Sequence, residues 1–216
     1  MLPLTFGRGH RRLRILCLGA HPDDIEIGCA GTLLRWISAY PNVEITWAVL
    51  SAAGDRADEA QRSAGALLRR AARLDVVLGQ FEDASFPAEF RRIKAYLQEL
   101  KQRSDADVVL THRLEDRHQD HRLLAELTWQ NWRNHLILEY EIPKFEGDLG
   151  QPNLYVPLSK AIAERKVGHL LNCFGSQRSK SWFNAEAFFA LMRLRGLECR
   201  APSGMAEAFH LRKGTL

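Results

Sequence analysis

The sequence predicts an α/β protein, a Rossmann-like three-layer sandwich with a mostly parallel sheet in a single domain. Apolar strand-like segments and amphipathic helix-like segments alternate along the chain with short connections. The strand-like segments are continuous apolar runs, such as LRILCLGA at 13–20, which are typical of strands that helices cover on both faces. A chain of 216 residues without an internal repeat fits one domain, which we expect at 13–216.

Each element before residue 143 has its own support in the sequence. The strand at 43–51 is rich in β-branched residues, and the helix at 57–73 has apolar residues at helical spacing. The helix at 88–104 is amphipathic and ends just before the apolar run of another buried strand. In order, the predicted elements are strand 13–20, helix 31–40, strand 43–51, helix 57–73, strand 74–79, helix 88–104, strand 105–112, helix 119–134 and strand 135–142.

The regular alternation stops after the fifth predicted strand. The segment 143–158 contains Pro, Gly and Asn, and it predicts a long ordered loop. Helices are expected near 159–172 and 184–195, followed by a last strand at 206–213. Residues 1–12 are expected to form a basic N-terminal tail.

Composition and charge argue against several classes of protein. Hydrophobic residues make up 46% of the chain and charged residues 26%, as in ordinary globular domains. The net charge is only +4 and the basic residues are scattered among acidic ones, so we expect no nucleic-acid partner. No run approaches the roughly 20 apolar residues of a membrane span. The cysteines, Cys17, Cys29, Cys173 and Cys199, form no CxxC pair, which favours reduced thiols in a cytoplasmic protein.

Two loops rich in His and Asp follow predicted strands. GAHPDDIEIGCAG (19–31) leaves the carboxyl end of the first strand, and THRLEDRHQDH (111–121) leaves the strand at 105–112. Ligands of open α/β sheets bind at the carboxyl ends of the strands, beside the point where the strand order reverses. We therefore expect the two loops to meet at one edge of the sheet.

The residue types in these loops suit a catalytic metal ion. Catalytic zinc takes three protein ligands from His and carboxylate groups and keeps an open position for water. His21 and Asp24 lie three residues apart in a turn that contains Pro22, so both can bind one ion. A third ligand must come from another part of the chain, and the second loop offers His118 and His121.

A site that activates water also needs a base and a donor. Asp23 lies next to the candidate ligands and can accept the proton of the water. His118, held by Asp120 or Asp116, can donate a hydrogen bond to an oxyanion. Each loop alone has a simpler interpretation, an aspartate N-cap of a helix near Gly28 or a solvated helix start at HQDH. Their occurrence together, at two strand ends, favours the metal site.

The two motifs resemble those of the LmbE-like or PIG-L family, zinc-dependent N-deacetylases of small glycoconjugates. The family's first motif is A-H-P-D-D followed by a glycine pair and a helix, and here it is AHPDDIEIGCAGTLL. The second motif is H-x-D-H at a helix start, and here it is HQDHR. Weaker similarities are SAAGD after the second strand, SQ at 176–177 and AEAF near the C-terminus. The resemblance covers about residues 13–211.

The resemblance implies a role for each polar residue of the two motifs. By position, the metal ligands are His21, Asp24 and His121. They would bind Zn2+, and Fe2+ also suits a site of two histidines and an aspartate. Asp23 would be the general base, His118 would stabilise the oxyanion or protonate the leaving amine, and Asp120 would orient His118.

The implied reaction is removal of an N-acetyl group from a small glycoconjugate, an N-acetylglucosamine-type sugar or a nucleotide-sugar. A zinc-bound water would attack the amide carbonyl, with Asp23 as the base. An amidase acting on thiol-sugar conjugates and a non-catalytic sugar-binding domain are the alternatives. An intact Asp23 favours an enzyme, because binding alone has no use for a base. The oligomeric state stays open, a homo-oligomer included.

Two positions depart from the family pattern. Members usually carry R-x-x-E on the helix after the second strand, and here Gly65 stands where the glutamate is expected. Arg62 remains as a candidate substrate contact. The glycine pair of the first motif is interrupted by Ala30.

Substrate contacts are otherwise expected in the C-terminal half of the chain. The main candidates are Tyr155, Gln177 and Arg178, and further side chains suited to sugar or phosphate groups are Tyr140, Lys144, Asn153, Lys180 and Trp182. The histidines without an evident partner, His10, His112, His135 and His169, are expected at the surface or in the core.

Overall fold

The computed structural model describes residues 12–215, and their strands form one seven-stranded sheet in the order β3-β2-β1-β4-β5-β7-β6. The strands are β1 (Leu13–Gly19), β2 (Val43–Val49), β3 (Arg73–Leu78), β4 (Val108–His112), β5 (Leu136–Tyr140), β6 (Leu154–Pro157) and β7 (Ala206–His210). Strands β1 to β5 pair in parallel, and β7 runs antiparallel between β5 and β6. The mostly parallel sheet is confirmed. Most of the expected basic tail at 1–12, with His10, lies outside the described residues.

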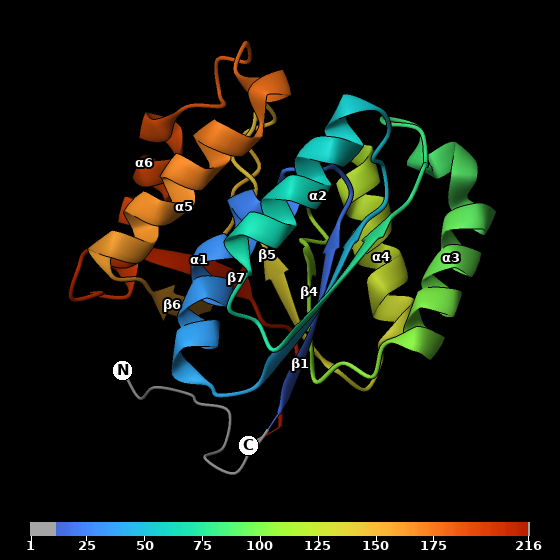
Figure 1. Cartoon of the computed structure of the whole chain (residues 1–216), viewed down its shortest axis with the longest axis horizontal. Helices are drawn as coiled ribbons and strands as arrows, with labels where there is room; N and C mark the ends of the chain where they lie inside the picture. The colour runs from blue at the N-terminus through green and yellow to red at the C-terminus, as the bar shows by residue number, and fades with distance from the viewer. Residues whose placement is uncertain (1–11, 216) are drawn as a thin grey trace.

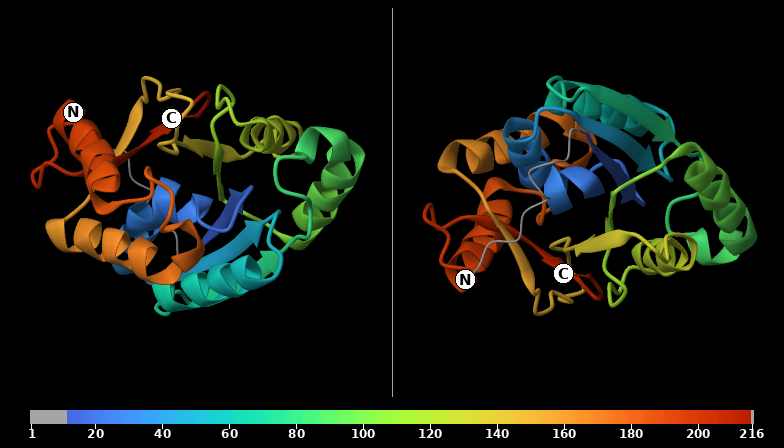
Figure 2. Two further views of the ribbon diagram at one scale, coloured as in Figure 1. Left: turned by 90° about the horizontal axis from the view of Figure 1, so that it is seen from above. Right: turned by 90° about the horizontal axis from the view of Figure 1, so that it is seen from below.

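The helices cover both faces of the sheet, as expected for a three-layer sandwich. They are α1 (Asp24–Ala39), α2 (Asp55–Leu67), α3 (Phe90–Arg103), α4 (Gln119–Asn131), α5 (Lys160–Cys173) and α6 (Ala185–Glu198), with short 3-10 turns η1 (Phe86–Glu89) and η2 (Gly175–Gln177). Buried side chains of α1, α2, α5 and α6 pack on one face, and those of α3 and α4 pack on the other. Figures 1 and 2 show α3 and α4 set apart from the other four helices.

The continuous apolar run of β1 is explained by these two cores. Ile15 and Cys17 face the α1 side, whereas Leu16 and Leu18 face the α3 side. All four side chains are at most 2% exposed. Successive side chains of a strand point to opposite faces, so a strand covered on both sides must be apolar at every position.

The order of the strands places the reversal point between β1 and β4. The chain runs outward from β1 to β2 and β3, and then crosses to β4 on the other side of β1. The turn at 20–23 and the loop at 113–118 leave the carboxyl ends of these two neighbouring strands. The two polar motifs therefore begin at the place where such sheets bind ligands.

Several expectations about single elements are wrong. Helix α1 begins at Asp24 and not near residue 31, and helix α2 ends at Leu67 and not at residue 73. The segment 143–158 contains strand β6, and the last strand ends at His210 and not at residue 213. Strand β6 forms because it pairs with β7, which follows about fifty residues later, and a local pattern cannot show such a pairing. The glycines of the first motif suggested a turn before the helix, but they lie inside α1.

Gly28 lies in α1 because Tyr140 packs directly against it. A Cβ atom at Gly28 would lie 2.3 Å from Cδ2 of the fully buried Tyr140. We therefore expect Gly28→Ala to lower the free energy of unfolding by about 1–3 kcal/mol through overpacking. Gly168 in α5 has open space around its Cα, so Gly168→Ala should raise it by roughly 0.5–1 kcal/mol. Denaturant unfolding measures both, and a Gly28→Ala variant as stable as the wild type would contradict the packing argument.

Two further findings concern the environment of the protein. Within residues 12–215 no helix has the length and apolarity that crossing a membrane requires. All four cysteines are free; Cys17 and Cys29 are buried, and Cys173 and Cys199 are partly exposed.

Candidate active site

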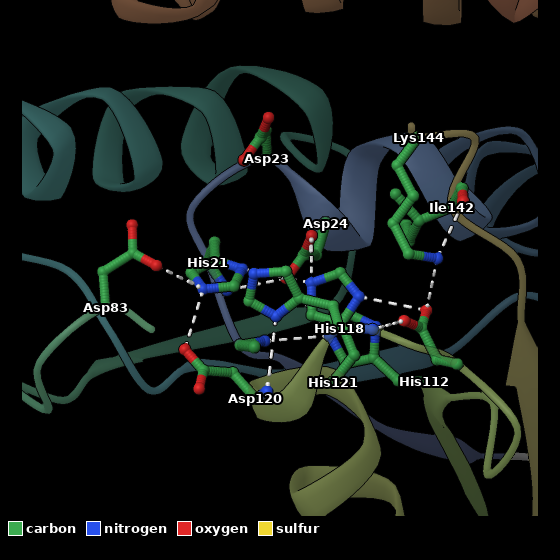
Figure 3. A network of polar contacts seen from close by, with 12 residues as sticks. His21, Asp23, Asp24, Asp83, His112, His118, Asp120, His121, Ile142 and Lys144 are labelled. Carbon is green, nitrogen blue, oxygen red and sulfur yellow. Dashed lines mark hydrogen bonds and ion pairs between the residues drawn. The ribbon is translucent and has the colours of Figure 1, made fainter. Parts of the chain in front are cut away.

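The two motifs meet at the carboxyl ends of β1 and β4, and Figure 3 shows His21 and Asp24 facing His118 and His121, whereas the side chain of Asp23 points away from them. His21, Asp23 and Asp24 come from the turn that joins β1 to α1, and His118 to His121 form the start of α4. The carboxylate of Asp24 accepts the backbone N–H of His21 at 2.7 Å, which folds the turn back on itself.

The three side chains predicted as metal ligands lie together. His21 Nδ1 is 3.1 Å from His121 Nε2, and the Asp24 carboxylate oxygens are 3.3 Å and 3.5 Å from these two nitrogens. Tetrahedral zinc with ligands at 2.0–2.1 Å separates neighbouring ligand atoms by about 3.3 Å. All three residues are less than 8% exposed. Two imidazoles and a carboxylate at these separations fit a catalytic zinc ion.

His112 also belongs to this cluster. The sequence showed no partner for it and placed it at the surface or in the core, and the structure places it in the core with partners from the site. It is the last residue of β4 and is fully buried, and its Nε2 lies 3.1 Å from Asp24 and accepts the backbone N–H of Ala20 at 3.0 Å. Its ring stacks on His121 with centroids 3.9 Å apart. The sequence carried one sign of this: His112 ends the strand from which the second motif leaves.

More than one set of three side chains has the spacing of a metal site. Ligand atoms lie within 4.8 Å of one another in the sets Asp24–His112–His121, His21–His118–His121 and His21–Asp83–Asp120. The predicted set overlaps the first two and supplies the mixed donors that catalytic zinc sites use.

Charge and burial give the histidines different protonation states. Burial lowers the pKa of His21, but the carboxylates of Asp24, Asp120 and Asp83 together raise it well above the usual value. Burial, with His112 nearby, lowers the pKa of His121 to about 4. Burial of Asp24 is outweighed by the surrounding histidines, which hold its pKa well below the usual value. A metal ion bound here must displace the proton of His21.

Asp23 occupies the N-cap position of α1, but its side chain makes no capping hydrogen bond. The residue is 4% exposed, and its carboxylate lies 3.4 Å from an Arg56 guanidinium nitrogen. Burial and the neighbouring Asp24 raise the pKa of Asp23 to about 6, although Arg56 and His21 act in the opposite direction. A carboxylate with a pKa near the working pH can act as a general base.

The two acidic side chains near the start of α4, Asp116 in the preceding loop and Asp120 in the first turn, have different partners. Asp116 lies 3.0 Å from Nδ1 of His121 and accepts the backbone N–H of His118 at 2.9 Å. The Asp120 carboxylate accepts the backbone N–H groups of Ala84 and Phe86 at 2.7 Å and 3.1 Å. Asp120 reaches His118 through its backbone N–H, which donates to Nδ1 at 3.3 Å. Orientation of His118 by the Asp120 carboxylate thus stays a prediction.

A family comparison connects this geometry to known proteins. The family model described as PIG-L, GlcNAc-PI de-N-acetylase, matches residues 16–132, more than half of the chain. The chain belongs to the PIG-L family. No curated protein matched the sequence in a separate search.

Several solved structures share the PIG-L fold of this chain at low sequence identity. The conserved protein TT1542 from Thermus thermophilus is 21% identical with a TM-score of 0.68, and the match covers 94% of this chain and 96% of that one. N,N'-diacetylchitobiose deacetylase from Pyrococcus horikoshii is 18% identical with a TM-score of 0.67, covering 92% and 83%. GalB, the 4-carboxy-2-hydroxymuconate hydratase from Pseudomonas putida, is 15% identical with a TM-score of 0.69, covering 94% and 98%.

The four candidate substrate contacts of this PIG-L chain lie apart from the histidine cluster. Arg62 is exposed and donates to the backbone of its own helix, and Arg178 is exposed and donates to the carbonyl of Leu171. Tyr155 lies on the edge strand β6, where its hydroxyl donates to the Pro152 carbonyl. Gln177 is buried in η2. The structure brings none of them to the metal ligands, and their substrate roles stay predictions.

Two other suggested sugar contacts have structural partners instead. Tyr140 is fully buried, and its hydroxyl donates to the Leu18 carbonyl at 2.6 Å. The Lys144 ammonium lies 3.0 Å from Asp116 and 2.7 Å from Asp148, which joins the segment after β5 to the loop that precedes α4. These contacts leave both side chains engaged within the protein.

Arg56 and Asp83 lie beside the site although no motif indicated them. Arg56 is near the start of α2 and Asp83 is in the loop after β3, and their side chains form an ion pair at 3.1 Å. Asp83 also lies 2.9 Å from Nε2 of His21. Arg56 directly follows the weak family similarity SAAGD at 51–55, whereas the stretch around Asp83 has ordinary surface composition and carried no sign of its position.

Proposed function

We propose that this PIG-L protein is a zinc-dependent deacetylase that hydrolyses the N-acetyl amide of a small amino-sugar conjugate. The observation that carries the proposal is the buried set His21, Asp24 and His121 with the uncapped carboxylate of Asp23 beside it. A sugar or nucleotide-sugar that presents an N-acetyl group is the substrate class, in keeping with the family description and with a structural relative that is a diacetylchitobiose deacetylase.

The chain's own residues supply the proton transfers. Zinc bound by the three ligands would polarise the amide carbonyl and lower the pKa of water in the site. Asp23 accepts a proton from the attacking water, after its carboxylate turns from Arg56 toward the ligands. The Nδ1 atom of His118 accepts the Asp120 N–H, so the neutral ring carries its proton on Nε2 and can donate to the oxyanion. Burial and the neighbouring His21 lower the pKa of His118, which favours this neutral form.

The loop after β3 contacts His21 through Asp83, and the segment after β5 contacts Asp116 through Lys144. In this proposal these two segments supply specificity. A thiol-sugar conjugate carries the same kind of amide, so an amidase of such conjugates remains the alternative that uses the same groups. We also place the protein in the cytoplasm, where its four free cysteines would stay reduced. A homo-oligomer is compatible with the proposal.

The proposal is tested by metal analysis followed by an acetate-release screen. The purified protein should contain zinc or iron, and it should release acetate from N-acetyl sugars or their nucleotide forms. A chelator should abolish the activity and added zinc should restore it, because the proposal assigns the activation of water to the bound metal. Release of another acid from thiol-sugar amides, without acetate release, would favour the amidase. Sugar binding without turnover of any amide would contradict an enzyme.

A further inference from the structure

A chain of three polar contacts crosses the edge of the proposed metal site. One carboxylate oxygen of Asp83 lies 2.9 Å from His21 Nε2, and the other accepts from the Arg56 guanidinium at 3.1 Å. The same guanidinium donates to Asp23 at 3.4 Å. Figure 3 shows Asp83 facing His21 from the side opposite the other histidines. The chain thus connects a proposed ligand with the proposed base.

The backbone next to Asp83 adopts an uncommon conformation. Ala84 has a φ of 62°, in the left-handed region that residues with a Cβ atom rarely use. Its N–H donates to the fully buried carboxylate of Asp120, which also accepts the N–H of Phe86. Such strain persists where surrounding contacts fix it, and it is concentrated at functional sites. Asp120 therefore holds the loop in the conformation that presents Asp83 to the site.

The two ring nitrogens of His21 have different surroundings. Nδ1 faces Asp24 and His121, the other two proposed ligands. Nε2 faces carboxylates only, Asp83 at 2.9 Å and Asp120 at 3.3 Å. A histidine that binds a metal donates its other ring N–H to a carboxylate, a carbonyl or water, which fixes the tautomer and the ring orientation.

His121 shows the same division between its nitrogens. Its Nε2 faces His21 and Asp24, and its Nδ1 lies 3.0 Å from the carboxylate of Asp116. Each proposed histidine ligand thus has one nitrogen on the ligand side and a carboxylate behind the other. For His121 that carboxylate is Asp116, two residues before the second motif, and for His21 the nearest one is Asp83, in the loop after β3.

We propose that Asp83 is a positioning residue of the metal site, whose carboxylate accepts the Nε2–H of His21 and keeps Nδ1 free for the metal. This inference rests on the proposed function, because it takes His21 as a metal ligand. Asp120 contributes by holding the loop, since its carboxylate is shared with two backbone N–H groups. The side chain of Asp83 is 52% exposed, so it can be replaced without opening a cavity in the core.

The experiment compares metal binding in Asp83→Ala, Asp83→Asn and Glu82→Ala. Zinc affinity is measured by competition with a chromophoric chelator, and the site geometry by the absorption spectrum of the cobalt-loaded protein. Asp83→Ala should lower zinc affinity about 10–100-fold and alter the cobalt spectrum. Asp83→Asn should lose less, because the amide oxygen can still accept from Nε2. Glu82 is the matched control, an exposed acidic neighbour on the same loop, and its replacement should leave the affinity unchanged.

The outcomes distinguish a wrong role for Asp83 from a wrong assignment of the metal-dependent function. Wild-type zinc affinity and an unchanged cobalt spectrum in Asp83→Ala, with only KM raised, would make Asp83 a substrate contact and overturn the proposal. A wild-type protein that binds no metal would instead refute the proposed function. Thermal unfolding of the metal-free variants shows whether they fold. If Asp83→Ala does not fold, Asp83→Leu decides, because its branched side chain has about the size of aspartate but no acceptor for Nε2–H. Wild-type zinc affinity in that variant, with the cobalt spectrum unchanged, would overturn the proposal.

Discussion

Asp23→Asn should lower kcat by about 10²–10⁴-fold and leave the metal in place. Asparagine has nearly the size of aspartate but cannot accept the proton of the attacking water. Asp23 lies outside the set of ligand atoms that are 3.1–3.5 Å apart, so its replacement should not weaken metal binding. The same substitution at Asp24 would remove a ligand charge, so the two adjacent aspartates should give different phenotypes.

The pH profile adds a second readout for Asp23. Burial raises the pKa of the metal-free carboxyl to about 6, and the charge of a bound cation lowers it from there. The base must be ionised, so the wild-type kcat should fall as the pH drops through 6 or somewhat below. The residual activity of Asp23→Asn should lack this dependence. Metal content, kcat and the profile are measured on the same preparations.

His121→Ala is the control that distinguishes a base from a ligand. It removes one of the three proposed ligands, and we expect loss of both metal and turnover. Turnover at the wild-type level in Asp23→Asn would show that another group is the base. Loss of metal in Asp23→Asn would place Asp23 among the ligands instead.

The sequence predicted the fold and the core of the site because both depend on local patterns. Continuous apolar runs such as 13–20 follow directly from a sheet covered on both faces. The chemistry of AHPDD and HQDH, at the ends of two parallel strands, predicted that His21, Asp24 and His121 would meet, and in the structure they do.

The parts that the sequence did not predict depend on contacts between distant segments. His112 appeared to be a strand residue without a partner, and only the pairing of β4 beside β1 brings it to Asp24. Asp83 reaches His21 through a loop that Asp120 holds in the left-handed conformation at Ala84. Neither periodicity nor composition can show such contacts, because they depend on the packing of several elements at once.

Helix α1, whose N-terminus carries Asp23 and Asp24, also depends on contacts with distant segments. Glu207 of β7 accepts the backbone N–H groups of Gly31 and Thr32 at 2.8 Å and 2.6 Å, in the middle of that helix. Lys166 of α5 binds the same carboxylate at 2.6 Å and donates to the Ile27 carbonyl at 2.5 Å. Gly31 and Thr32 lie within the continuous helix α1, in which backbone amides point to the carbonyls four residues earlier, so the Glu207 carboxylate adds a second acceptor for these amides. A buried ion pair therefore takes part in the hydrogen bonding of α1.

Glu207→Gln should lower the free energy of unfolding by about 3–5 kcal/mol, because it leaves the Lys166 ammonium buried without its counter-charge. Both side chains of the pair are 3% exposed, so water cannot replace the lost carboxylate. The control is the ion pair between Lys160 and Glu164 on α5, the helix that carries Lys166. The side chains of this pair are 83% and 56% exposed. Glu164→Gln should change the stability by less than about 1 kcal/mol.

Denaturant unfolding of the metal-free proteins measures both effects without a contribution from metal binding. A second variant, Lys166→Met combined with Glu207→Gln, removes the unpaired charge and should recover part of the lost stability. If Glu207→Gln were no more destabilising than Glu164→Gln, the pair would not support α1. A loss of stability confined to Glu207→Gln, with partial recovery in the double variant, would mean that β7 and α5 stabilise α1. These elements of the C-terminal part of the chain would then support the helix whose N-terminus presents the proposed base and a proposed ligand.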